Sequence, residues 1–297
     1  MIPGALTTRP HVAQLPMAPG DPSAAPTPSA SPTLGASPTA GGSASPIGTV
    51  QVLDPTKDSW TEAANLPTPR TDLAAATGTD GRIYAIGGRA GGRATDTVEV
   101  YTPSSDSWAS GTPLPAAMGE PRAARGTDGR IYVLDGTMMA VYDPDASSWS
   151  TADAPPNPVV GPALTALPDG RILAAGGIPA AGGTVSSAAY AYTPGSAGGS
   201  GSWTQVSDLP TEVTQAAGAA GPDGRVYVIG GRGTDGAVTD AVQVYSPDDD
   251  QWTAGPTGAA STRANAAATT GGDGRVYVFG GTAGAGRPLD TVSALHG

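Results

Sequence analysis

One nine-residue stretch occurs five times in this chain of 297 residues, and this repetition constrains the fold more than any other feature. The first copy reads DGRIYAIGG, and the later copies are close variants of it. Successive copies begin 48, 41, 54 and 50 residues apart, at Asp80, Asp128, Asp169, Asp223 and Asp273. Periods of this size are typical of proteins that repeat one structural unit. We therefore expect a repeat architecture.

Each repeat divides into four short strands separated by turn residues. In the copy covering residues 70–115, the strand DLAAAT is followed by Asp80-Gly81, a strong hairpin signal. RIYAIGG forms the second strand, TDTVEVYTP alternates with period two up to Pro103, and a fourth strand begins at Trp108. One such sheet cannot bury both of its faces, whereas copies stacked around an axis can. The pattern predicts an all-β fold of the β-propeller type.

Side chains within a repeat grow larger from the first strand to the fourth. Small residues such as Ala74–Thr77 fit an innermost strand, and the pair Gly87-Gly88 permits a positive φ or a close backbone approach. Aromatic residues lie further out, and we expect them to pack between blades because they supply most of the buried area. They are Tyr84, Tyr132, Tyr227 and Tyr277 in second strands, Tyr101, Tyr142, Tyr192 and Tyr245 in third strands, and Trp60, Trp108, Trp149, Trp203 and Trp252 in fourth strands.

The repeat resembles the kelch family. The resemblance rests on a glycine pair after the second strand, a Tyr in the third strand and a Trp seven residues later, as in Gly87-Gly88, Tyr101 and Trp108. The same residues recur as Gly230-Gly231, Tyr245 and Trp252. The resemblance covers roughly residues 49–295 and implies a kelch-type β-propeller of a secreted bacterial type. Two copies depart from the pattern, because Asp135 replaces a glycine and Leu173 replaces a tyrosine.

Counting strands leaves two closures open. Third strands number six, because residues 49–55 precede the first full copy and residues 291–297 end the last one, whereas fourth strands number five. We favour six blades of four antiparallel strands, with the extreme N-terminus beside the last third strand. The alternative is five blades, in which the strand near Trp60 completes the last blade and the N-terminal residues form a disordered tail. Because the chain ends without its last fourth strand, the incomplete last blade offers a further route, self-association through its edge.

The N-terminal region differs in composition from the repeats. Residues 18–47 are rich in Ser, Thr, Pro and Ala, a composition typical of extended linkers in secreted or cell-envelope proteins. We predict closing strands in residues 1–17, a low-complexity segment in residues 18–47, and a single propeller domain in residues 48–297. The predicted location is extracellular or in the cell envelope, although the N-terminus lacks the pattern of a signal peptide.

Composition excludes several classes of function. The net charge of −11 argues against nucleic-acid binding, which requires a basic surface. No apolar run is long enough to span a membrane. Cysteine is absent, which excludes disulfides, thiolate metal sites and the Cys–Tyr centre that the resemblance would imply for a kelch-type copper oxidase. Two histidines are too few for a histidine-rich metal site, so we expect no metal and no cofactor.

Arginines gather where the resemblance places the mouth of a propeller channel. In a four-stranded meander, second-to-third loops and blade-to-blade loops emerge on the same face. Arginine suits planar anions because it donates two parallel hydrogen bonds. The alternative is that these are solvated surface charges balanced by nearby carboxylates. The candidate ligand-binding ring is Arg9, Arg70, Arg122 and Arg263 at the start of inner strands, with Arg89 and Arg232 in adjacent loops.

These observations favour a binding or display module without catalytic residues, which offers its propeller mouth to a protein or an anionic glycan. Two other classes stay open. One is a sugar-active propeller enzyme, an epimerase or a lyase, that uses arginine and carboxylate groups at the mouth. The other is a structural subunit that assembles through the open blade edge.

Overall fold

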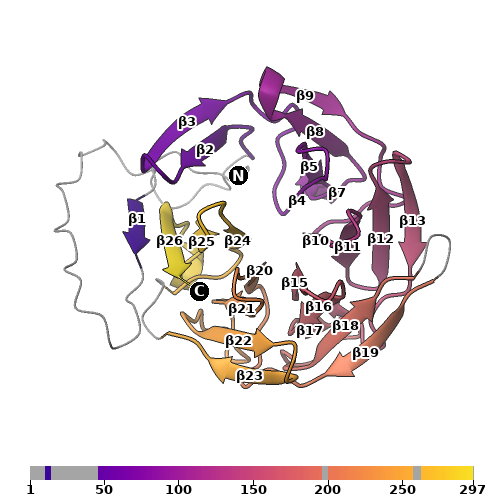
Figure 1. Cartoon of the computed structure of the whole chain (residues 1–297), viewed down its shortest axis with the longest axis vertical. Helices are drawn as coiled ribbons and strands as arrows, with labels where there is room; N and C mark the ends of the chain where they lie inside the picture. The colour runs from indigo at the N-terminus through magenta and orange to yellow at the C-terminus, as the bar shows by residue number, and fades with distance from the viewer. Residues whose placement is uncertain (1–10, 15–45, 196–199, 257–261, 297) are drawn as a thin grey trace.

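The computed structural model describes residues 11–14, 46–195, 200–256 and 262–296. These residues contain strands and two single-turn 3₁₀ segments, η1 (Pro103–Ser105) and η2 (Gly284–Gly286), and no α-helix. Five four-stranded sheets stand around a central axis as the blades of a propeller (Figure 1). In the chain order of their innermost strands we call them the first to the fifth blade. The predicted all-β fold of the β-propeller type is confirmed.

The strand bounds show that one pattern repeats from blade to blade. The first blade is β4 (Ala74–Thr77), β5 (Ile83–Ile86), β8 (Val98–Thr102) and β9 (Ser107–Ser110). The second is β10 (Arg122–Arg125), β11 (Ile131–Asp135), β12 (Met138–Asp143) and β13 (Ser148–Ala152). The third is β15 (Ala163–Ala166), β16 (Ile172–Ala175), β18 (Ala189–Thr193) and β19 (Ser202–Val206). The fourth is β20 (Ala217–Ala220), β21 (Val226–Ile229), β22 (Val242–Ser246) and β23 (Gln251–Ala254).

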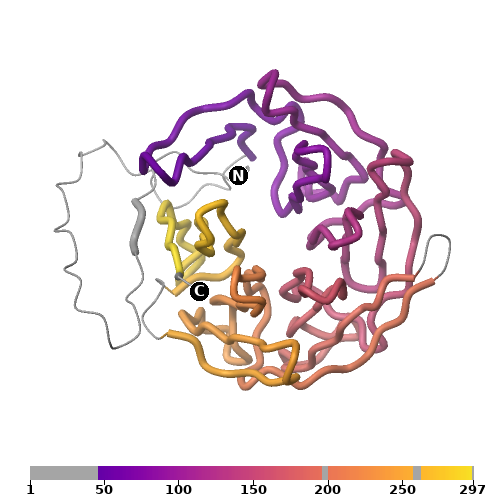
Figure 2. Tube along the Cα trace, in the orientation of Figure 1, coloured from indigo at the N-terminus to yellow at the C-terminus, as the bar shows by residue number. Residues whose placement is uncertain are grey.

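The fifth blade is built differently. Its strands are β24 (Ala267–Thr270), β25 (Arg275–Phe279), β26 (Thr291–His296) and, at the outer edge, β1 (His11–Gln14). The strand β1 comes from the other end of the chain and pairs with β26 in parallel, whereas the outer strands of the first four blades are antiparallel to their neighbours. In the tube of Figure 2 the chain that follows residue 46, in indigo, lies at the same side of the ring as the C-terminal strand, in yellow.

The predicted number of six blades is wrong, and the alternative of five blades is confirmed. The detail of that alternative needs correction, because the strand near Trp60 does not complete the last blade. Instead β3 (Ser59–Ala63) pairs with β2 (Val50–Asp54) as a separate antiparallel hairpin. The physical reason is that pairing with the strand adjacent in sequence costs little loop-closure entropy. Shorter pairs elsewhere are β6 (Arg89–Ala90) with β7 (Arg93–Ala94), and β14 (Val159–Val160) with β17 (Ile178–Pro179).

The β2–β3 hairpin packs between the fifth and the first blade (Figure 1). On one side Trp60 and Leu53 contact the core of the fifth blade, which contains Tyr277 and Val292. On the other side Val50 joins a cluster with residues of the first blade. The hairpin therefore fills the outer part of the sector between these two blades.

Local sequence explains why the repeated nonapeptide forms a hairpin. In the first blade Gly81 turns the chain with φ of 74°, and the Asp80 carboxylate accepts hydrogen bonds from the Arg82 backbone N–H at 2.9 Å and the Tyr84 hydroxyl at 2.9 Å. At the end of the same strand Gly88 has φ of 96°, and a Cβ there would meet the carbonyl oxygen of Thr71 at 2.5 Å. The backbone itself therefore requires the turn glycine, and it requires the glycine pair in the four copies that contain one.

Aromatic side chains pack between neighbouring blades, as expected. The rings of Tyr84 in the first blade and Tyr142 in the second lie 5.3 Å apart, within one buried cluster. Third-strand tyrosines also stack on fourth-strand tryptophans, as Tyr101 does on Trp108 at 5.1 Å. The core is thus a series of interfaces between blades, and the predicted packing role of these residues is confirmed.

No helix long and apolar enough to cross a bilayer occurs within the described ranges. The predicted division of the chain at residues 17 and 47 stays a prediction, since most of residues 1–47 lies outside those ranges.

Candidate functional site

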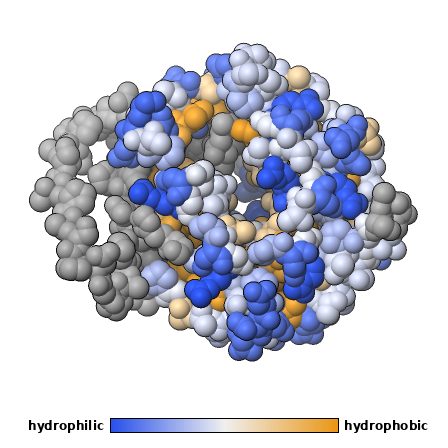
Figure 3. All heavy atoms as spheres, in the orientation of Figure 1, coloured by the Kyte–Doolittle hydropathy of each residue, from blue (hydrophilic) through white to orange (hydrophobic). Residues whose placement is uncertain are grey.

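The five innermost strands, β4, β10, β15, β20 and β24, surround the axis (Figure 1). A channel runs between them and is hollowed in the space-filling view (Figure 3). Its cavity has a volume of about 670 Å³. Alanine and threonine side chains make up most of the wall, because inner strands crowd close to the axis and leave room for small residues only. The charged side chains that line it are Asp72, Arg122 and Arg125.

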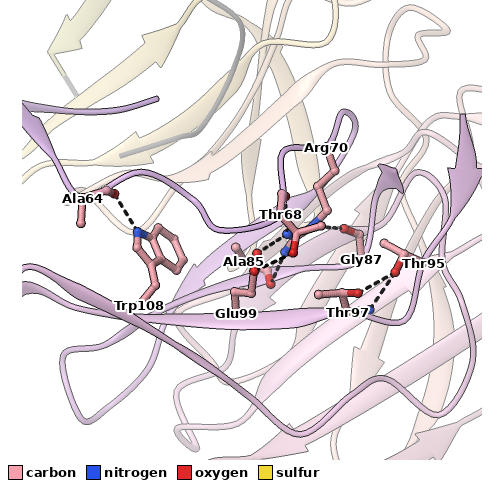
Figure 4. A network of polar contacts seen from close by, with 9 residues as sticks. All are labelled: Ala64, Thr68, Arg70, Ala85, Gly87, Thr95, Thr97, Glu99 and Trp108. Carbon is pink, nitrogen blue, oxygen red and sulfur yellow. Dashed lines mark hydrogen bonds and ion pairs between the residues drawn. The ribbon is translucent and has the colours of Figure 1, made fainter. Parts of the chain in front are cut away.

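Two arginines of the predicted ring are not at this channel. The side chains of Arg70 and Arg263 are buried, with 3% and 0% of their surface exposed. Arg70 donates hydrogen bonds to the carbonyl oxygens of Gly87 at 2.7 Å and Ala85 at 2.9 Å, and it forms an ion pair with Glu99 (Figure 4). Arg263 donates to the same places in its own blade, Val278 O at 3.2 Å and Gly280 O at 3.3 Å. Burial lowers the pKa of Arg263 to about 10.

Counting back from the hairpin turns explains this burial. In each hairpin turn, the backbone N–H of one residue donates to the carbonyl oxygen of the residue four positions later. In the first blade Gly78 donates to Arg82 in this way, and we call this donor the turn residue. The residue eight positions before it is buried in every blade, whatever its type. These five equivalent residues are Arg70, Met118, Val159, Val213 and Arg263.

The predicted equivalence of Arg122 with Arg70 and Arg263 is therefore wrong. Arg122 lies four residues before its turn residue Gly126, so it matches Ala74 on the inner strand, and Met118 is the true counterpart of Arg70. Arg70 and Arg263 are corrected to structural residues that satisfy backbone carbonyls inside a blade, because a buried guanidinium must place its donors. Sequence reasoning missed this because the two positions are only four residues apart.

Among the described arginines of the predicted ring, Arg122 is the one that lines the channel. Its side chain is half-buried, and burial lowers its pKa, while the nearby Glu120, Asp72 and Asp135 carboxylates oppose that shift. Its one hydrogen bond to a described residue is a long contact of 3.4 Å from Nη1 to the carbonyl oxygen of Pro121. A guanidinium carries five N–H donors. Most donors of Arg122 are therefore available to a group in the channel.

Acidic residues arrange the loops beside Arg122. The Asp135 carboxylate accepts hydrogen bonds from the backbone N–H groups of Gly119 at 2.7 Å and Glu120 at 3.2 Å. Glu120 in turn forms an ion pair with Arg89 at 3.3 Å. The residue that replaces a kelch glycine, Asp135, thus fixes the loop that carries Glu120. We call Asp72, Arg89, Glu120, Arg122 and Asp135 the mouth cluster.

The other predicted ring members lie elsewhere. Arg232 is partly exposed and donates to the Gln215 side chain at 3.2 Å and the Gly236 carbonyl at 3.1 Å, on the fourth blade. Arg9 lies outside the described residues. Ligand binding by Arg89, Arg122 and Arg232 stays a prediction. Among described residues, no group of three or more His, Cys, Asp or Glu side chains is placed to hold a metal ion.

Comparison with known proteins supports the repeat assignment. Residues 70–115 and 215–258 match the model of the kelch motif. A mouse protein described as kelch-like protein 35 is 46% identical over 54 residues, which are 18% of this chain and 9% of that protein. The match thus spans less than a tenth of that relative's length, and it concerns the repeat alone.

Solved structures share the fold. The chain resembles the protein in "Structure of YjhT" with a TM-score of 0.67 at 16% identity, covering 86% of this chain and 98% of the other. It also resembles a fungal alcohol oxidase of the AA5 family in complex with copper, with a TM-score of 0.62 at 21% identity, covering 86% of this chain and 58% of that one. At these identities the likeness shows the fold alone. Residues 70–115 and 215–258 thus match kelch motifs, and the chain as a whole has the fold of a β-propeller.

Proposed function

We propose that this protein is a binding module, without catalysis of its own, that takes an anionic group of a protein or glycan ligand at the channel mouth. The kelch β-propeller fold suggests a binding module, and kelch propellers generally bind proteins. The observation that carries the anionic preference is Arg122, a channel guanidinium with a single 3.4 Å hydrogen bond to a described residue.

The surroundings of Arg122 support a carboxylate as the bound group. Its donors lie in a channel between the inner strands, where bulk water screens an ion pair less than at an open surface. A guanidinium binds a planar carboxylate through two parallel hydrogen bonds. The carboxylates of Glu120 and Asp72 restrict which anions can bind. They would repel a ligand whose negative charge is spread widely across the mouth. We therefore expect one carboxylate to enter, with neutral polar groups around it.

The extracellular location rests on the composition of residues 18–47 and is part of the same proposal. Detection of the native protein in culture supernatant or envelope fractions, separated from cytoplasmic markers, tests it. Recovery with the cytoplasmic fraction alone would contradict it.

The experiment on the site compares two arginines of one strand. Acidic peptides and carboxylated glycans are screened on an array, and the affinity of the best binder is measured for Arg122→Gln and Arg125→Gln. Arg125 lies on β10 three residues further on, so its loss changes net charge equally at the other end of the strand. Charge-assisted hydrogen bonds contribute about 1.5–3 kcal/mol, so Arg122→Gln weakens binding by about 10- to 100-fold. Equal effects of the two substitutions would contradict the site, and turnover of a bound glycan would favour the sugar-active alternative.

A further inference from the structure

The fourth strands of the blades form a belt around the rim of the propeller, in which the end of each strand meets the start of the next (Figure 1). The contact is made by tryptophan. The indole Nε1–H of Trp108 donates to the carbonyl oxygen of Ala64 at 2.7 Å, and Ala64 lies four residues after Trp60 (Figure 4). The same spacing holds at the next three junctions, where Trp149 donates to Thr112, Trp203 to Asp153 and Trp252 to Ser207. We call the accepting residue of each junction the exit residue.

At two of these junctions an aspartate accepts a hydrogen bond from the backbone N–H of the same exit residue. The carboxylate of Asp106 accepts the backbone N–H of Ala64 at 2.7 Å, and that of Asp250 accepts the backbone N–H of Ser207 at 2.9 Å. Each aspartate lies two residues before its tryptophan and adopts a left-handed backbone, with φ of 46° and 50°. The Asp–Trp pair is thus a two-point clamp that recognises one residue by its N–H and its carbonyl, without regard to side chain.

The hairpin β2–β3 carries the same clamp at the start of the belt. Asp58 lies two residues before Trp60 and has the same backbone conformation, with φ of 47°. The ring of Trp60 packs against the fifth blade, in contact with the cluster containing Val292 and Ala294 of β26. Its Nε1 atom is buried and has no hydrogen-bond partner, alone among the buried side-chain polar atoms of the described residues. A buried donor without an acceptor is costly, by an amount comparable to a lost hydrogen bond.

The outer strand of the fifth blade does not supply the expected exit residue. Fourth strands run antiparallel to their third strands, whereas β1 runs parallel to β26 and hence against the direction of the belt. Its C-terminal end therefore leads away from Trp60. Parallel pairing is also slightly less stable per residue than antiparallel pairing, and β1 has only four paired residues.

We propose that the edge of β26 together with Asp58 and Trp60 is an acceptor site for an antiparallel strand from another polypeptide. The four occupied junctions define its chemistry: an extended segment with an aromatic residue, free of proline over the strand, whose fourth residue after the aromatic offers its carbonyl to Trp60. As at two of those junctions, the same residue offers its N–H to the aspartate, here Asp58. Strand addition of this kind gains its affinity from main-chain hydrogen bonds. The incoming strand replaces β1, and this site is separate from the channel mouth.

A peptide copied from the chain itself tests the proposal. Residues 104–114, SSDSWASGTPL, contain β9 and its exit residue Thr112. The labelled peptide is titrated into the full chain by fluorescence anisotropy, and a second peptide has prolines at both Ala109 and Ser110. Because ladder bonds alternate along a strand, two successive prolines remove at least one donor in any register. We expect saturable binding of the first peptide and none of the second.

Substitutions in the protein locate the site. Trp60→Phe keeps most of the packing and removes the indole donor, and Asp58→Ala removes the acceptor. Each lost hydrogen bond of about 1 kcal/mol weakens peptide binding by about fivefold. Asp248→Ala is the matched control, since it removes one exposed acidic side chain from an outer turn of the fourth blade, and it leaves the affinity unchanged. Melting temperatures of the variants confirm that they are folded. Absence of binding at millimolar peptide, or equal affinity in all three variants, would overturn the proposal.

The indole proton of Trp60 reports on the occupant directly. Its NMR resonance, assigned by its loss in Trp60→Phe, moves downfield when the peptide binds, toward the resonances of the hydrogen-bonded tryptophans. Two other results would overturn the proposal. A resonance already at the hydrogen-bonded position in the free monomer would mean that a segment of the same chain fills the clamp. A concentration-dependent dimer that is lost in Trp60→Phe would mean that a second copy fills it.

Discussion

Replacing Arg70 with methionine tests whether the buried arginine is a structural part of the first blade. Arg70 forms an ion pair with Glu99, and the side chains of the two residues are 0% and 6% exposed. In Arg70→Met the carboxylate of Glu99 stays buried with one neutral partner, the Thr68 hydroxyl at 2.9 Å. Breaking a buried ion pair from one side typically costs about 3–5 kcal/mol, because the other charge is left uncompensated.

The second blade supplies the design of a compensating change. At the position of Arg70 it carries Met118. Where the first blade has Glu99 opposite Ala85, the second blade has Ala140 opposite Val133. Met118 and Ala140 are both buried, so the fold accepts an apolar pair at this place. The double variant Arg70→Met with Glu99→Ala removes both charges, and it loses the three hydrogen bonds from Arg70 to the carbonyls of Gly87, Ala85 and Thr68. We expect a loss of about 1–2 kcal/mol relative to the wild type.

Urea unfolding followed by tryptophan fluorescence gives the free energy of unfolding of the wild type, of Arg70→Met and of the double variant. Arg82→Met is the control, because Arg82 forms an exposed ion pair in the same blade, for which a loss below about 1 kcal/mol is expected. A single variant that loses less than about 1 kcal/mol would mean that Arg70 and Glu99 are not coupled. A double variant as unstable as the single one would show that the carbonyl contacts of Arg70, and not its charge, hold the blade.

Two further predictions concern the belt. Trp108→Ala should cost about 3 kcal/mol, the low end for a large aromatic because Trp108 is only partly buried, and a loss below about 1 kcal/mol in urea unfolding would contradict its packing role. Hydrogen bonds from the Ala64 N–H and the Tyr101 hydroxyl lower the pKa of Asp106, so the stability it contributes is present above the ordinary carboxyl pKa and is lost as pH falls through the lower folded value. Tyr101→Phe should raise the Asp106 pKa in a ¹³C NMR titration, and an unchanged titration would contradict this cause.

The sequence predicts the fold better than it predicts the residues of the candidate site. The sequence pattern groups Arg122 with Arg70 and Arg263, whereas in the structure these two lie four residues out of phase with it. A shift of four positions moves a residue from the end of a loop to the inner strand, and the similar sequences of the turns hide the shift. In the sequence, Asp135 is only a departure from the kelch pattern. Its hydrogen bonds to the Gly119–Glu120 loop depend on two segments meeting in space.

What the sequence determined by itself is the repeated unit. The Asp-Gly turns, the glycine pairs with positive φ and the Tyr–Trp spacing are local requirements of backbone and strand geometry, so they can be read from the sequence of the individual copies. Only the tertiary structure decided how the ring closes and which charged side chains are bonded to partners inside it. Whether β1 or β3 lies beside β26, and whether an arginine meets a buried carbonyl or an open channel, depends on contacts between distant segments. In such contacts several strands or hydrogen-bond donors compete for the same partner. A local sequence pattern does not show which of them forms the contact.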